Sequence, residues 1–169
     1  MRVRQGQLDD AEGLAALAIQ VWLHTYATDG VSSVIASYVL SEFTPEKFET
    51  RLTDAASTVI VAEIDKNLVG YTIAATDAAC PVSTAAKVEL ATLYVQEHFV
   101  GKGVGSSLLR QAERWARQRA DSALWLTVNS RNSRARAFYA KHGYTALGVT
   151  FFRLGDEYHE NLVLIGPDI

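Results

Sequence analysis

The sequence predicts a mixed α/β or α+β fold in which helices pack on the faces of a central sheet. Segments that alternate like β-strands are interleaved with amphipathic helical segments along the whole chain. The 169 residues are 49% hydrophobic, which is enough for one core, and only three are proline. Since no linker, repeat or low-complexity tract interrupts the chain, a single domain over residues 1–169 is expected.

The first half of the chain begins with a short edge strand at residues 3–5. Asp9 or Asp10 then caps a helix with one apolar face, formed by Leu14, Leu17, Ala18 and Val21. The stretch from Trp22 through Tyr38 mixes aromatic and turn residues, and a second helical region follows on both sides of Pro45.

Strand-like alternation returns at residues 57–64 and 68–75, around a tight turn at Asp65-Lys66-Asn67. The small and polar residues 74–86 are expected to form a loop between strands. Two more strands, at about residues 145–154 and 158–165, end the chain.

The most informative stretch is residues 88–109, where a β-like run leads into closely spaced glycines and then into an amphipathic helix. Gly101, Gly103 and Gly105 remove the side chains that would keep backbone N–H groups apart. A helix opening at about Ser106 aims its free N–H groups and its positive dipole end at the same point. This arrangement predicts a cradle for a diphosphate-bearing ligand, although glycines at this spacing also close ordinary strand-to-helix corners.

Two common phosphate-binding motifs do not fit this stretch. The glycines alternate as G-x-G-x-G in the second half of the chain, whereas the dinucleotide fingerprint is G-x-G-x-x-G near the start of a βαβ unit. Lys102 is followed by Gly103, so the Ser or Thr hydroxyl that a P-loop uses to hold magnesium is missing.

A second informative block, residues 124–144, is typical of strand, polar turn, helix and glycine stop. Alternation over residues 124–128 suits a strand that is covered on both faces. Asn132 or Ser133 caps the helix and Gly143 ends it. The apolar stripe of that helix consists of Ala135, Phe138 and Tyr139.

The two blocks together resemble the two signature motifs of the GNAT superfamily of acyl-CoA-dependent N-acyltransferases. The residues that carry the resemblance are Val95, Gly101-Lys-Gly103-Val-Gly105, Leu108-Leu109, Asn132, Ala135, Phe138-Tyr139 and Gly143-Tyr144. The last strands and Glu89-Leu-x-x-Leu-Tyr94-Val95 are similar to the branch that includes spermidine/spermine acetyltransferases. The resemblance implies a largely antiparallel sheet that splays beside the phosphate loop, with the helices after Trp22 over the acceptor side.

The resemblance also implies acetyl-CoA as co-substrate. The residues expected to hold it are Leu93, Tyr94, Val95, Val100, Gly101, Lys102, Gly103, Val104, Gly105, Ser106, Asn132 and Tyr139. Family members usually begin the phosphate loop with Gln or Arg, whereas this chain has Val100. Because backbone N–H groups make most of the cradle, this departure weakens contacts with the co-substrate at most.

N-acetyl transfer from a thioester needs a base for the amine, a polarised carbonyl and an acid for the leaving thiolate. Glu89 is the candidate base, directly or through water, or else an ion-paired strand residue, and Glu63 and Asp77 are weaker rivals. The family places a Tyr at position 139 near the departing sulfur, which makes Tyr139 the candidate acid unless it only packs the helix. Backbone N–H groups around Leu93–Val95 would polarise the carbonyl.

The acceptor pocket is expected to be lined by aromatic and imidazole side chains that suit an alkylammonium chain, unless these residues belong to the core. The candidates are Trp22, His24, Tyr26 and Tyr38. The four histidines lack metal-ligand spacing and there is one cysteine, so no metal site is expected. No G-x-S-x-G sequence points to a serine nucleophile, which favours direct transfer.

Composition narrows the partners. A net charge of −3 gives no basis for nucleic-acid binding and suits a cationic amine only weakly. One cysteine, a polar start and no bilayer-length apolar run predict a cytoplasmic protein without a membrane anchor. The partner expected is a small-molecule amine, and a homodimer is left open as the assembly.

The leading hypothesis is therefore an acetyl-CoA-dependent N-acetyltransferase that acts on a small primary amine, polyamines being one candidate. The alternative is a catalytically silent acyl-CoA-binding module that regulates a partner protein. A sensor of acyl-CoA needs neither a base nor an acid, so the presence of both Glu89 and Tyr139 favours the enzyme.

Overall fold

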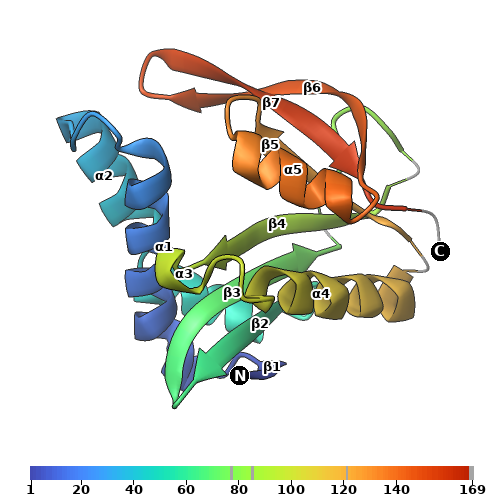
Figure 1. The fold of residues 1–169 in the computed structure, drawn as a ribbon, viewed down its shortest axis with the longest axis horizontal. Helices are drawn as coiled ribbons and strands as arrows, with labels where there is room; N and C mark the ends of the chain where they lie inside the picture. Colours follow the sequence, from blue (N-terminus) through green and yellow to red (C-terminus); the bar gives the residue numbers. More distant parts are fainter. Residues whose placement is uncertain (77, 85, 121, 168–169) are drawn as a thin grey trace. The chain divides into compact units, whose positions relative to one another are not determined.

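The computed structural model describes residues 1–76, 78–84, 86–120 and 122–167. It contains a seven-stranded sheet in the order β1-β2-β3-β4-β5-β7-β6, with α-helices between the strands (Figure 1). β1 and β2, β5 and β7, and β6 and β7 pair antiparallel, whereas β4 and β5 pair in parallel. This mixed, mostly antiparallel sheet confirms the predicted fold class.

The described residues group into two compact units. Unit 1 comprises Met1–Ile73 and Thr92–Ala112, and unit 2 comprises Ala74–Ala91 and Glu113–Ile169. The strands β3 and β4 and the helix α4 each run from one unit into the other. The single domain expected over residues 1–169 stays a prediction.

Unit 1 holds the N-terminal helices and the strands they cover. Its elements, including the three that continue into unit 2, are β1 (Arg2–Gln5), α1 (Ala11–Tyr26), α2 (Ser33–Glu42), α3 (Pro45–Thr53), β2 (Ser57–Ile64), β3 (Asn67–Ala75), β4 (Val88–Val95) and α4 (Val104–Ala120). Alternation in β2 separates two cores: Val61 packs with α1 and α3, while Ala62 packs with Val104 and Leu108 of α4. These contacts hold the first turns of α4 against the sheet.

The start of α1 corrects one sequence prediction. Asp10 occupies the N-cap position, but its side chain makes no cap hydrogen bond to the helix, and Asp9 lies in the preceding 3₁₀ turn. The Asp10 carboxylate instead accepts two bonds from the Arg4 guanidinium, at 2.7 and 2.9 Å, and one from the Gln7 N–H at 2.8 Å. A charged partner on β1 outcompetes the helix amides, because charge-assisted hydrogen bonds are stronger than neutral ones.

The hairpin of β2 and β3 confirms the predicted strands with a shorter turn. Asp65 and Lys66 have φ of 50° and 68°, which is the backbone of a two-residue type I′ turn. Asn67 was predicted within the turn, yet it is the first residue of β3.

Unit 2 contains the end of the sheet and one helix. Its complete elements are β5 (Leu124–Asn129), α5 (Ser133–Lys141), β6 (Thr145–Leu154) and β7 (Glu157–Ile165). The Asn132 Oδ1 atom accepts a hydrogen bond from the Ala135 N–H at 3.0 Å, and Gly143 ends the helix region with φ of 83°. Of the two predicted caps, Asn132 is therefore the one that forms.

β4 and β5 meet over a short parallel contact in unit 2. Val88 pairs with Leu124 and Glu89 with Trp125. Strands that diverge can pair only over a short length, so these two residue pairs agree with a sheet that splays beyond them. Along the described chain, no helix combines the length and the hydrophobicity needed to cross a membrane.

Candidate functional site

The glycine loop of unit 1 has the backbone that the sequence predicts. After a 3₁₀ turn at Glu97–Phe99, Gly101 and Gly103 adopt φ of 78° and 82°, and a Cβ at either position would meet no atom within 4 Å. Left-handed backbone here depends on glycine, and the space beside it is open. The loop therefore leaves room for a ligand to approach the main chain.

α4 begins at Val104, two residues before the predicted start at Ser106. The reason is burial: Val104 is 1% exposed and packs with Leu108, so the core draws the helix start toward the loop. Gly105 consequently belongs to the first helical turn. The first N–H groups of a helix carry the positive end of its dipole, and here the Ser107 N–H, the fourth of the helix, bonds to the Gly103 carbonyl at 3.0 Å. Loop and helix start together suit a phosphate group.

The end of β4 is held close to β3 by a residue that sequence reasoning missed. A Cβ on Gly70 would lie 2.8 Å from the Tyr94 carbonyl oxygen and 3.2 Å from the Val104 Cγ1 atom. The Thr72 hydroxyl donates to the Thr92 carbonyl at 2.7 Å beside it. Gly70 thus allows β3 to pass directly against the predicted acyl-binding strand. A glycine inside a strand pattern was the available signal.

Three of the four predicted acceptor-site residues form one aromatic cluster in unit 1. The Trp22 ring lies 5.0 Å from Tyr26 and 4.9 Å from Tyr38, between ring centroids. Phe43 then links Tyr38, at 6.0 Å, to Tyr94 of β4, at 6.4 Å. The predicted acceptor residues are therefore connected through ring contacts to a residue predicted to hold acetyl-CoA.

This cluster runs from the surface into the core. Tyr26 is 41% exposed, whereas Trp22 is buried and Tyr71, which contacts Tyr94 at 5.6 Å, is fully buried. Burial, followed by the charges of Glu42 and Tyr26, raises the pKa of Tyr38 to about 12. Tyr38 therefore presents a neutral phenol at physiological pH. Trp22 and Tyr71 are thus buried, Tyr38 is half-buried and Tyr26 is exposed.

His24 takes a different position from the other predicted acceptor residues. Its Nε2 atom lies 3.4 Å from a Glu97 carboxylate oxygen, and the side chain is exposed. One turn earlier, Gln20 accepts a hydrogen bond from Gln96 at 2.8 Å. These contacts tie α1 to the segment that precedes the glycine loop, rather than to the aromatic rings.

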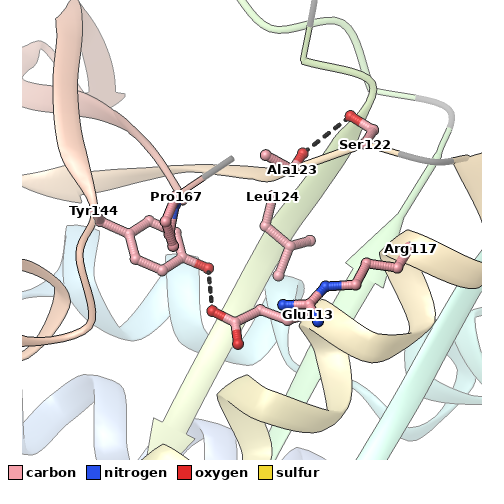
Figure 2. Close-up of a pocket in the computed structure, with 8 residues that line it drawn as sticks. Glu113, Arg117, Ser122, Ala123, Leu124, Tyr144 and Pro167 are labelled. Atoms are coloured by element: carbon pink, nitrogen blue, oxygen red, sulfur yellow. Dashed lines mark hydrogen bonds between the residues drawn. The ribbon is translucent and has the colours of Figure 1, made fainter. Parts of the chain in front are cut away.

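Tyr139 of unit 2 lies in an aromatic group on α5. Its ring is 5.2 Å from Phe138 and 5.5 Å from Tyr144, and the residue is 8% exposed. The Tyr144 hydroxyl donates to the Glu113 carboxylate at 3.2 Å in a small surface pocket beside Arg117 and Pro167 (Figure 2). Burial, then Glu113, raises the pKa of Tyr144 well above its usual value. Tyr144 therefore keeps its proton, donates a hydrogen bond to Glu113 and packs against Tyr139.

The candidate bases differ in their surroundings. Glu89 is half-buried in β4 and stands opposite Trp125 of β5. Glu63 on the β1–β2 edge forms an ion pair with the Arg4 guanidinium at 2.9 Å. Its carboxylate therefore already has a positively charged partner. Asp77 lies outside the described residues. Among the residues that the structure covers, no three His, Cys, Asp or Glu side chains gather as a metal site.

Sequence comparison places the chain among acetyltransferases. The model of the acetyltransferase (GNAT) family matches residues 19–144. An uncharacterised N-acetyltransferase of Mycobacterium tuberculosis is 29% identical over 158 residues, covering 94% of this chain and 97% of the relative. The spermidine N(1)-acetyltransferase of Thermoplasma acidophilum is 26% identical over 148 residues, covering 85% of this chain and 88% of the relative.

Solved structures show the same fold. The PaiA N-acetyltransferase of Thermoplasma acidophilum, in complex with coenzyme A, has a TM-score of 0.73 at 22% identity, with 95% of this chain and 96% of that chain covered. A probable acetyltransferase of Staphylococcus epidermidis has a TM-score of 0.76 at 18% identity, with 97% and 96% covered.

Proposed function

The chain belongs to the acetyltransferase (GNAT) family, and we propose that it transfers the acetyl group of acetyl-CoA directly to a primary amine of a small molecule, with polyamines as the first candidates. The observation that carries this proposal is the loop at Gly101 and Gly103, whose left-handed glycines open onto the first turn of α4. Backbone amides at a helix N-terminus are a suitable site for a diphosphate.

Acetyl-CoA fits the residues present. The backbone of residues 100–106 would hold its diphosphate, and the main chain of residues 93–95 and the Asn132 side chain would hold the pantetheine arm and the thioester. The Lys102 ammonium lies 5.3 Å from the centre of the Phe99 ring, which keeps a positive charge beside the loop. Val100 removes no backbone donor, so this site does not depend on the usual Gln or Arg.

Glu89 and Tyr139 would move the two protons of the reaction. Acetyl-CoA supplies the acetyl group as a thioester, so an amide bond forms as the carbon–sulfur bond breaks. Glu89 takes the proton that the amine nitrogen loses, directly or through a water molecule. Tyr139 gives its phenolic proton to the departing thiolate. Backbone N–H groups of residues 93–95 stabilise the negative charge that develops on the carbonyl oxygen.

The acceptor proposal is supported by the aromatic cluster. The rings of Tyr26 and Tyr38 would contact an alkylammonium chain, and the buried Trp22 packs against both rings. His24 contacts Glu97 and not the rings, so it would border the acceptor site on the side of the segment that precedes the glycine loop. A relative over most of the chain is a spermidine N(1)-acetyltransferase, which makes spermidine the first amine to test.

A thiol-release assay with acetyl-CoA and a panel of amines tests the function, with mass spectrometry to identify the acetylated product. We expect coenzyme A release that depends on a small primary amine, with one acetyl group added per thiol released. Acetyl-CoA binding without turnover on any amine would favour the alternative, an acyl-CoA-binding regulatory module. The homodimer left open by the sequence is checked separately by sedimentation.

A further inference from the structure

Three side chains of unit 2 each have a buried polar atom that lacks a hydrogen-bond partner. These are, within the described part of the chain, the Trp125 Nε1, His159 Nε2 and Asn161 Oδ1 atoms. Buried polar atoms normally find a partner, because leaving one unpaired costs about 1–3 kcal/mol. The Trp125 Nε1–H group is a donor, whereas the Asn161 Oδ1 atom is an acceptor that lacks a donor within the described residues.

All three side chains lie on the same face of the sheet. Trp125 of β5 pairs with Ile165 of β7, and residues directly opposite each other in a sheet share a face. Because alternate residues of a strand share a face, His159 and Asn161 point to the same side as Ile165. Asn161 also stands opposite Asn129 of β5, which adds a second amide to that side.

This face also carries the proposed base. Glu89 of β4 pairs with Trp125, so its side chain shares the Trp125 side of the sheet. Asn161 lies four residues along β7 from Ile165, the residue opposite Trp125. That offset is ~13 Å along the strand, and two strand spacings of ~4.8 Å separate β4 from β7, so Glu89 and Asn161 lie ~16 Å apart in the sheet. The proposed base and the unpaired Asn161 oxygen therefore occupy one face, separated by the length of an extended small molecule.

We propose that Asn161, assisted by the Glu157 carboxylate, binds a second N–H donor group of the acceptor amine and thereby selects diamines over monoamines. This inference rests on the proposed function, because it assigns the far end of the same substrate. The Asn161 carbonyl oxygen accepts hydrogen bonds, and an ammonium group offers only donors. The His159 Nε2 atom lies 3.6 Å from the Glu157 carboxylate, which favours a proton on that nitrogen, so His159 borders the site without accepting a bond from the ammonium group.

The electrostatics of the face agree with a cationic ligand end. The Glu157 carboxylate lies 3.6 Å from His159 Nε2 and favours positive charge nearby. The His159 side chain is 31% exposed and Asn161 is half-buried. Both residues therefore keep part of their side-chain surface accessible to solvent. Asn161 makes the selective hydrogen bond, and Glu157 adds attraction at longer range.

The substitution Asn161→Leu separates this role from a structural one. If Asn161 supports the fold, the variant loses a hydrogen bond and its thermal midpoint falls. If the amide oxygen is unpaired in the folded protein, an apolar side chain of similar volume leaves the midpoint unchanged or higher. A gain or no change in stability, together with a loss in binding, is the signature of a group kept for a ligand.

Calorimetry with hexamethylenediamine and hexylamine, in the presence of coenzyme A, tests the proposal because the two probes differ by one terminal ammonium. We expect the wild type to prefer the diamine by about tenfold or more, and Asn161→Leu to remove that preference while hexylamine binding stays constant. Glu160→Gln, the neighbour on the opposite face of β7, is the matched control and should keep the preference. Asn161→Asp retains an acceptor oxygen and should keep it too.

Three results would overturn the proposal: equal binding of both probes by the wild type, an unchanged preference in Asn161→Leu, or a clear fall in the thermal midpoint of that variant. Failure of the proposed function has a different signature. In that case the diamine binds selectively to the wild type, yet no coenzyme A is released when acetyl-CoA and the diamine are combined.

Discussion

We propose ligand-binding roles for the glycine loop of unit 1 and for the sheet face of unit 2 that carries Asn161 (the Asn161 face), and the two use different parts of the chain. The loop offers backbone amides, exposed by glycines with positive φ and fixed by the buried Val104. The β5–β7 face offers side-chain atoms. Backbone groups are the same in every residue, so we expect the loop to bind its ligand despite Val100, whereas one side-chain substitution would change the Asn161 face. Recognition by backbone groups suits acetyl-CoA, the acetyl donor that a whole family shares. Recognition by side chains suits the amine substrate, which can differ from one family member to another.

A third polar region shows what a structural cluster looks like. Arg4 is paired with Asp10 at 2.7 Å and with Glu63 at 2.9 Å, all three side chains being largely buried. Every charge there has a partner, so removing one leaves another unpaired in the fold. The Asn161 face lacks this completeness.

The largest expected effect is on the loop. Gly103→Val places a β-branched residue at φ of 82° and fills the open space beside the backbone. We expect acetyl-CoA affinity to fall by about 100-fold or more, measured by calorimetry. Gly30→Val is the matched control, since Gly30 has φ of 104° with equally open surroundings outside the loop. If both variants lost the same acetyl-CoA affinity, backbone strain alone would explain the result and the loop would have no specific role in binding.

Turnover should fall next most strongly in Tyr139→Phe. The change keeps the ring contacts with Phe138 and Tyr144 and deletes only the hydroxyl. Loss of a positioned acid predicts a decrease of about 10²-fold in kcat, with little change in acetyl-CoA affinity. Tyr144→Phe removes a neighbouring phenol that donates to Glu113, and it should keep near-normal kcat. Wild-type turnover in a folded Tyr139→Phe enzyme would exclude Tyr139 as the acid.

Gly70→Ala tests the packing beneath the loop. The new Cβ would lie 2.8 Å from the Tyr94 carbonyl oxygen, a backbone atom that cannot move without shifting β4. We expect a loss of about 1–3 kcal/mol in the free energy of unfolding, measured by urea denaturation. Gly13→Ala meets only the tip of Leu68 and gains helix propensity, so it should be neutral or stabilising. Equal stability of the two variants would contradict this account of Gly70.

The smallest effect concerns Asp10 and depends on pH. Hydrogen bonds from Arg4, and then from the Gln7 N–H, hold the pKa of Asp10 below its usual value despite partial burial. The pairing therefore stabilises the fold above the unfolded-state pKa of about 3.9, and this contribution is lost as pH falls through the lower folded-state pKa. Asp10→Asn should cost about 1–2 kcal/mol at pH 7 and progressively less in acid. A pH-independent difference in unfolding free energy would contradict the assignment.

Local signals predicted much of this molecule. Gly101, Gly103, Asn132 and Gly143 were found from sequence because each acts through its own backbone or its immediate neighbours. The start of α4 was placed two residues late, since burial of Val104 is a tertiary effect. The cap at Asp10 failed for a similar reason, because Arg4 on another element claims its carboxylate.

The Asn161 face lay beyond sequence reasoning for a geometric reason. Alternation in residues 158–165 shows that Asn161 and His159 share a side, but not which side or which neighbours. The register with β5 supplies that information, by placing both on the side of Trp125 and Glu89. Whether a buried atom lacks a partner is known only when all neighbours are placed.

The central claim is that the glycine loop binds acetyl-CoA and the Asn161 face binds the amine. Steady-state kinetics of the Gly103→Val and Asn161→Leu variants test it most directly, with one substrate varied while the second is saturating. We predict that Gly103→Val raises the KM for acetyl-CoA while the KM for hexamethylenediamine stays near wild type. Asn161→Leu should do the reverse, by about tenfold. If both variants raise the same KM, or if neither separates the two substrates, the loop and the strand face do not have the distinct roles assigned to them.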